Sequence, residues 1–301
     1  MVADENAQPA AVWRRAVLTA VICAILLVAV YLLAVWTRAG QRFEDAVLNA
    51  ASAAAGQSGD ARATDTLDAV TAPFLAGATL VVLAIGLLRH RLFLGLVGAC
   101  VIGASVLTAE VVRRLLLRPV LLPHGYRRED QSFPSGHSAV AMSVMCALIL
   151  VVPQRWRGVV AAAGSLWAAS VVVATVTASW HRPSDTLGSD LIVAGYTCVA
   201  IAVLARRGYV RPVPGRIRVP RRVYGAVAVL AFLAVTVAGA MAIDRLGGIH
   251  REALRGYLLT AGRGLALAGT VAVTLVVLAV LRRVDLAPPV SRSTLGEVPT
   301  R

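Results

Sequence analysis

The sequence has no lysine and little charge, since Asp, Glu and Arg make up only 15% of its 301 residues. Soluble domains carry about 25% charged residues, so this shortage argues against a soluble nucleic-acid binder, which displays its basic residues on a polar surface. A disordered chain is excluded as well, because 58% of the residues are hydrophobic. The four cysteines lie in separate apolar runs, a pattern typical of small buried residues and not of a disulfide framework or a metal cluster.

Long apolar runs dominate the sequence instead. The mean hydropathy is +0.74, and a helix that crosses a bilayer needs about 20 apolar residues. Eight segments meet or approach this length: 16–36, 73–88, 92–112, 137–152, 159–178, 186–205, 223–243 and 264–281. The sequence therefore predicts an all-α, polytopic helical bundle in the cell membrane.

The arginines predict how the bundle is oriented. Most of the formal net charge of +14 comes from Arg before the first span, in alternate short loops and after the last span. Because such loops stay in the cytoplasm, we expect both chain termini to be cytoplasmic. The loops at 37–72, 113–136 and 179–185 should then be extracytoplasmic. The loop at 113–136 nevertheless contains five Arg. Because this is an exception to the orientation rule, these arginines need a local explanation.

That loop ends in Pro134-Ser135-Gly136-His137, directly before a predicted span. Ser135 is a favourable N-cap, and a helix N-terminus attracts anions through its free N–H groups. Gly136 allows an anion to approach the backbone, while His137 can exchange a proton near neutral pH. The alternative is a capped helix in which His137 has no chemical role.

A second outer loop contains His181 and Asp185. Residues four apart in a helix lie one turn from each other, so a contact between the carboxylate and the imidazole is possible. Such a contact fixes the tautomer of the histidine and stabilises its protonated form. The alternative is structural, because Ser184 or Asp185 would also suit the first turn of the next span.

Arg118-Pro119, Pro134-Ser135-Gly136-His137 and His181-x3-Asp185 follow in this order on one predicted membrane face. Together they resemble the three motifs of the type-2 phosphatidic acid phosphatase superfamily, which consists of integral membrane lipid phosphatases. The resemblance covers roughly residues 73–205, and its second motif matches completely. The Lys of the first motif and the Arg of the third are missing, because Val111 and Thr175 occupy those positions.

Two other arginines are candidates for the missing phosphate-binding cations. Arg114 lies one turn before Arg118 and could reach the same helix face, although it could equally form a salt bridge with Glu110. Arg182 adjoins His181, although it could equally contact lipid headgroups.

The resemblance implies a mechanism without metal or other cofactor. His181 would attack phosphorus and form a phosphohistidine, with Asp185 orienting it, and His137 would act as general acid and then as general base. Arg118, Ser135 and Gly136, with Arg114 and Arg182 as the candidate substitutes, would hold the phosphoryl oxygens.

These observations predict a six-span, phosphatase-like core with two further C-terminal spans. An anchor span and outer loop (1–72) precede the core (73–205), which is followed by a basic linker (206–222) and a two-span extension (223–301). The resemblance implies a lipid phosphatase that hydrolyses a lipid phosphomonoester or diphosphate on the extracytoplasmic face. Its partners would be that substrate and membrane lipids, without nucleic acid. The alternative is an inactive relative that binds or moves anionic lipids.

Overall fold

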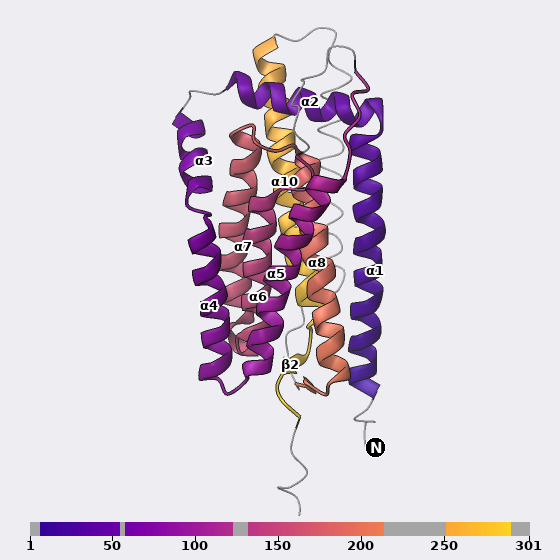
Figure 1. Cartoon of the computed structure of the whole chain (residues 1–301), viewed down its shortest axis with the longest axis vertical. Helices are drawn as coiled ribbons and strands as arrows, with labels where there is room; N and C mark the ends of the chain where they lie inside the picture. Colours follow the sequence, from indigo (N-terminus) through magenta and orange to yellow (C-terminus); the bar gives the residue numbers. More distant parts are fainter. Residues whose placement is uncertain (1–6, 55–57, 123–131, 214–250, 290–301) are drawn as a thin grey trace, which may run out of the picture.

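The computed structural model describes residues 7–54, 58–122, 132–213 and 251–289. Within these residues the chain forms nine helices and two short strands (Figure 1). They are α1 (Ala7–Val35), α2 (Arg38–Ala53), α3 (Ser58–Asp68), α4 (Ala72–Leu88), α5 (Leu92–Leu115), α6 (Gly136–Val151), α7 (Gln154–Thr177), α8 (Pro183–Arg206), β1 (Val210–Pro212), α10 (Arg251–Val280) and β2 (Val284–Leu286). Helices α1, α5, α7, α8 and α10 are long and apolar enough to cross a membrane. The structure thus confirms the predicted all-α, polytopic helical bundle.

Seven of the eight predicted spans coincide with helices of the bundle, and the eighth, at 223–243, lies outside the described residues. Two of the seven are short. Helix α4 reaches membrane-crossing length only together with the end of α3, from which it is bent by 57°. Helix α6 has only 16 residues. By length and composition, the described residues therefore hold five or six candidate spans.

Helices α6 and α8 form the centre of the bundle. Helix α8 packs against α1, α5, α6 and α10, while α6 also contacts α5 and α7. Both helices are apolar on nearly all sides, as expected of a helix that is surrounded by others. Met142 and Met145 of α6 and Ile201 and Leu204 of α8 are fully buried. These two central helices provide a rigid base for the residues at their N-termini.

Helix α2 lies across one end of the bundle, nearly at right angles to the other helices (Figure 1). Its N-cap is Thr37, whose side chain accepts a hydrogen bond from the Gly40 N–H. The sequence predicted an outer loop over 37–72, and the structure contains α2 and α3 there. Hydropathy misses α2 because only one of its faces is apolar: Val47 and its neighbours pack against α7 and α10. We call this end of the bundle the α2 end.

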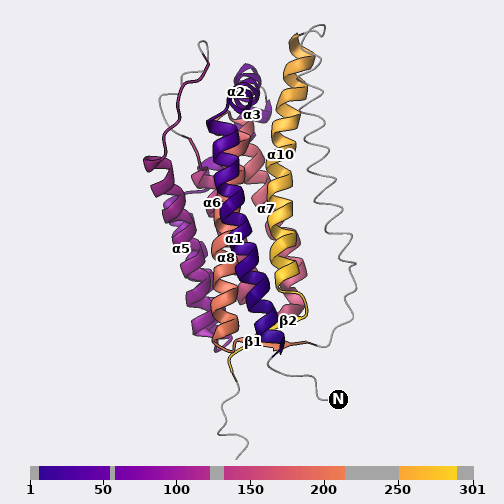
Figure 2. The same cartoon turned by 90° about the vertical axis from the view of Figure 1, so that its right-hand side faces the viewer.

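The opposite end is closed by a small antiparallel sheet, in which β1 pairs with β2 and Val210 lies opposite Leu286 (Figure 2). Asp285 of β2 lies 3.6 Å from both Arg91 and Arg157. The sheet joins the chain after α8 to the chain after α10, and the ion pairs join β2 to the start of α5 and to α7.

Candidate active site

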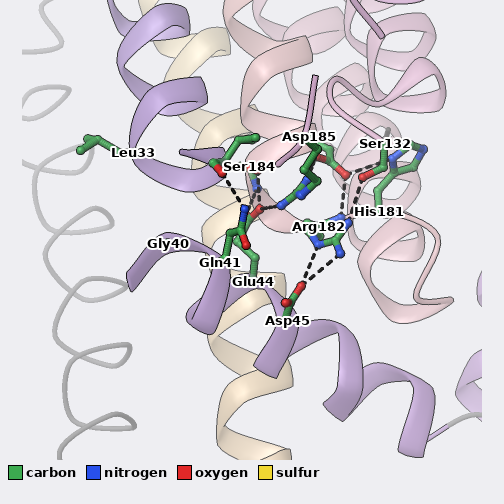
Figure 3. Close-up of polar contacts among 12 residues, drawn as sticks. Leu33, Gly40, Gln41, Glu44, Asp45, Ser132, His181, Arg182, Ser184 and Asp185 are labelled. Carbon is green, nitrogen blue, oxygen red and sulfur yellow. Dashed lines mark hydrogen bonds and ion pairs between the residues drawn. The ribbon is translucent and has the colours of Figure 1, made fainter. Parts of the chain in front are cut away.

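The ends of four helices meet beneath α2. Helices α5 and α7 end there, and α6 and α8 begin there, so that the three sequence motifs come together at the α2 end (Figure 1). The sequence predicts this end to be extracytoplasmic. Figure 3 shows the polar contacts that connect the loop before α8 with α2.

The turn before α6 is held against α8. Ser135 is the N-cap of α6, as predicted, and its hydroxyl accepts a hydrogen bond from the Ser138 N–H. The Ser135 N–H donates to the carbonyl of Asp185 at 2.9 Å, and the Ser189 hydroxyl donates to the carbonyl of Ser135 at 2.6 Å. The second motif is thereby fixed relative to the carboxylate of the third.

His181 and Asp185 form the predicted contact, with Nδ1 of the imidazole 3.4 Å from Oδ2 of the carboxylate. The same Oδ2 accepts a hydrogen bond from the backbone N–H of Arg182 at 2.9 Å. Asp185 is fully buried, and His181 is 8% exposed. Because Nδ1 faces the carboxylate, Nε2 is the nitrogen left to react.

His137 is half-buried at the second position of α6. Its ring meets the ring of Trp180 edge-on at a centroid distance of 5.5 Å. Because Trp180 directly precedes His181, this contact brings the imidazole of His137 close to the loop that carries His181.

Arg118 also joins this group. Its Nη1 lies 3.8 Å from Oδ1 of Asp185, so the arginine approaches one carboxylate oxygen while His181 approaches the other. Its Nη2 lies 2.8 Å from a carboxylate oxygen of Glu44 on α2. A guanidinium and an imidazole on either side of one buried carboxylate can bind a phosphoryl group and attack it.

Glu44 is a residue of the site that the sequence reasoning missed. It is 2% exposed, and besides Arg118 it accepts hydrogen bonds from the N–H and the hydroxyl of Ser184 at 2.9 and 2.8 Å. Burial raises the pKa of Glu44, and the Asp185 carboxylate raises it further, against the effect of Arg118 and Ser184. The only signal in the sequence is the amphipathic spacing of α2, which places Glu44 on the same buried face as Val47 and Leu48.

Arg182 is bound to protein groups at all three of its guanidinium nitrogens. Nε and Nη2 donate to Asp45 of α2 at 3.3 and 3.1 Å, and Nη1 donates to the Ser132 hydroxyl at 3.3 Å (Figure 3). The sequence suggested phosphate or a lipid headgroup as its partner. In the structure Arg182 is 3% exposed and ties α2 to the segment before α6.

The structure does not bring Arg114 to the other site residues. Its side chain is 75% exposed, and its Nε donates to Glu110 at 2.7 Å. Of the two alternatives for Arg114, the geometry thus favours the helical salt bridge. Arg113 also pairs with Glu110, and its side chain is 40% exposed.

The two positions without the expected cations differ in their surroundings. Val111 is 42% exposed on α5, whereas Thr175 is fully buried on α7. The carbonyl of Thr175 accepts hydrogen bonds from the N–H groups of Trp180 and His181, so this residue shapes the loop that carries the imidazole. Among the residues that the structure describes, no group of three or more His, Cys, Asp or Glu is arranged to hold a metal ion.

Comparison with known proteins gives one match. The family model of the PAP2 superfamily matches residues 113–211, a stretch that holds all three motifs and thus confirms the resemblance seen in the sequence. Neither the curated proteins nor the solved structures contain a match.

Proposed function

Because residues 113–211 belong to the PAP2 superfamily, we propose that this chain is an integral membrane lipid phosphatase that works through a phosphohistidine. It would hydrolyse a lipid phosphomonoester or diphosphate at the α2 end, on the extracytoplasmic face. The observation that carries the proposal is the placement of Asp185 between His181, at 3.4 Å, and Arg118, at 3.8 Å.

The first chemical step is an attack by His181. Its Nδ1–H is held by Asp185, which leaves the lone pair of Nε2 for the phosphorus atom. A bond forms between Nε2 and phosphorus as the bond from phosphorus to the leaving oxygen breaks, and His137 donates a proton to that oxygen. The Asp185 carboxylate stabilises the positive charge that develops on the attacking imidazole.

The second step releases phosphate. His137, now neutral, takes a proton from water as the water oxygen attacks phosphorus, and the bond between phosphorus and Nε2 breaks. Arg118 and the N-terminus of α6, with Ser135 and Gly136, hold the phosphoryl oxygens and stabilise their charge in both transition states. The backbone contact between Ser135 and Asp185 keeps this anion site aligned with the nucleophile.

Release of phosphate by the purified full-length protein in detergent micelles tests the proposal. The panel contains phosphatidic acid, phosphatidylglycerol phosphate and a polyprenyl diphosphate, and His181→Ala is the test variant. We expect His181→Ala to lose at least about a thousandfold in kcat, because the nucleophile is gone. Rapid acid-free quenching and mass spectrometry of the wild type should locate a phosphoryl group on His181.

A matched control comes from His90, which lies between α4 and α5 at the end of the bundle away from α2 and has a φ of 52°. His90→Asn removes an imidazole, and Asn tolerates this backbone conformation, so turnover should stay near that of the wild type. Equal turnover of His181→Ala and wild type would refute the phosphohistidine mechanism.

A second function has support from one observation. Arg118 and Arg182 are both paired with carboxylates of α2, as would suit a relative that binds or moves anionic lipids without hydrolysing them. The same panel separates the two functions, because such a protein would bind the lipid phosphates and release no phosphate from any of them.

A further inference from the structure

Two consecutive acidic residues of α2 hold the two arginines nearest to the His181–Asp185 pair. Glu44 binds Arg118 at 2.8 Å, and Asp45 binds Arg182 at 3.1 Å. These contacts join residues 74 and 137 positions apart in the sequence. The mechanism proposed above uses neither carboxylate.

Their presence changes the charge of the site. Arg118 and Arg182 supply two positive charges, whereas Glu44, Asp45 and Asp185 supply three negative charges when all are ionised. The family's two other cationic positions are Val111 and Thr175 here. With neutral histidines these five residues therefore carry a net negative charge when Glu44 is ionised and no net charge when it is protonated, although their chemistry requires an anionic substrate.

Glu44 also restricts how much of Arg118 a substrate can reach. The carboxylate of Glu44 accepts hydrogen bonds from Nη2 of Arg118 and from the N–H and the hydroxyl of Ser184. A bound anion would make similar contacts with these three donors. Nη1 of Arg118 is buried and has no hydrogen-bond partner among the described residues. Nη1 lies 3.8 Å from Oδ1 of Asp185, so a phosphoryl group that binds Arg118 would lie close to the carboxylates of Asp185 and Glu44.

We propose that Glu44 and Asp45 determine substrate charge: they restrict the site to lipids that carry a single phosphate group and disfavour lipid diphosphates. This inference rests on the phosphatase function proposed above and names its substrate class. Both residues act through the arginines that they hold, so they are specificity-determining residues and take no part in bond breaking. A phosphomonoester carries about two negative charges at neutral pH and a diphosphate about one more, and this additional charge is what the α2 carboxylates repel.

The test compares kcat/KM for dioleoyl phosphatidic acid with kcat/KM for farnesyl diphosphate, in one preparation of each full-length variant. The wild type should prefer phosphatidic acid. Glu44→Gln and Asp45→Asn keep the side-chain size and one accepting oxygen, and each removes one charge. Each should shift the ratio toward the diphosphate on the order of tenfold, as expected for one unit charge acting on another within a partly buried site.

Glu110→Gln is the control, because Glu110 is an acidic residue of the same predicted face that pairs with Arg113 and Arg114 outside the cluster. Its ratio should change by less than about twofold. A ratio measured within one preparation does not depend on the folded fraction, so a merely structural role for α2 would lower both activities and leave the ratio unchanged. If Glu44→Gln yields no folded protein, the ratio of kcat/KM measured for Asp45→Asn tests the proposal.

The outcomes separate the two proposals. An unchanged ratio in both variants, or a wild type that prefers farnesyl diphosphate, would overturn the role of Glu44 and Asp45 and leave the phosphatase function intact. A wild type that releases phosphate from neither lipid would overturn both.

Discussion

The contact between Gly188 and Phe133 is the most sensitive point of packing in the site. Gly188 lies on α8, three residues after Asp185, and the ring of Phe133 packs directly over it. A Cβ atom added to Gly188 would lie 2.6 Å from Cζ and 2.7 Å from Cε2 of that ring. Ordinary contact begins at 3.4 Å, so Gly188→Ala requires a displacement of about 0.8 Å.

The residues around Phe133 restrict its movement. Its side chain is fully buried, and its ring lies 5.4 Å from that of Tyr31. The displacement must therefore pass to the adjoining turn, which holds the N-terminus of α6. A misplacement of about 1 Å can reduce turnover by about a hundredfold, and overpacking costs about 1–3 kcal/mol of stability. We expect Gly188→Ala to lower kcat by about 10- to 100-fold and to lower the Tm as well.

Phosphate release and thermal unfolding measure the two effects. Gly103→Ala on α5 is the matched control, because no atom lies within 4 Å of its added Cβ, and it should behave like the wild type. Adding Phe133→Leu to Gly188→Ala removes the ring atoms that clash and should restore part of the lost stability. If Gly188→Ala keeps the turnover and the Tm of the wild type, the turn and α8 are not coupled as described.

Two further predictions concern single charges. Arg114→Ala should change kcat/KM by less than about threefold, because exposed ion pairs contribute little and Arg114 pairs with Glu110; a loss of tenfold or more would show that Arg114 helps to bind the substrate. Burial and Asp185 raise the pKa of Glu44, so the folded state binds the Glu44 proton more tightly than the unfolded state does. The free energy of unfolding therefore falls as the pH rises from the ordinary pKa of a glutamate through the raised pKa. Glu44→Gln should therefore flatten the decline of Tm over that pH window, and an unchanged decline would show that another group causes it.

The membrane helices could be predicted because their signal is local. A run of about 20 apolar residues has few alternatives to a membrane helix, and seven of the eight predicted spans coincide with helices that the structure describes. Helix α2 escaped prediction because its mean hydropathy is low and its apolar face becomes recognisable only once α7 and α10 cover it. Its length of 16 residues also falls below what a membrane span requires.

The same distinction between local and distant contacts applies to the predicted site residues. His181 and Asp185 are four residues apart, and the helical spacing that suggested their contact is the one observed. For Arg114, spacing allowed either a phosphate site beside Arg118 or a salt bridge with Glu110, and the structure contains the salt bridge. Arg182 had no local partner in the sequence at all, since Asp45 lies 137 residues away.

The sequence alone was sufficient to predict a membrane helical bundle with three motifs at one end, and to show that two of the expected cations are absent. Hydropathy and short-range spacing contain that information because they reflect forces within one helix or between a helix and lipid. Only the tertiary structure decided which charges neighbour one another. Glu44 and Asp45 reach Arg118 and Arg182 because packing lays α2 across the bundle end, where a lower effective dielectric constant strengthens the Coulombic attraction within each pair.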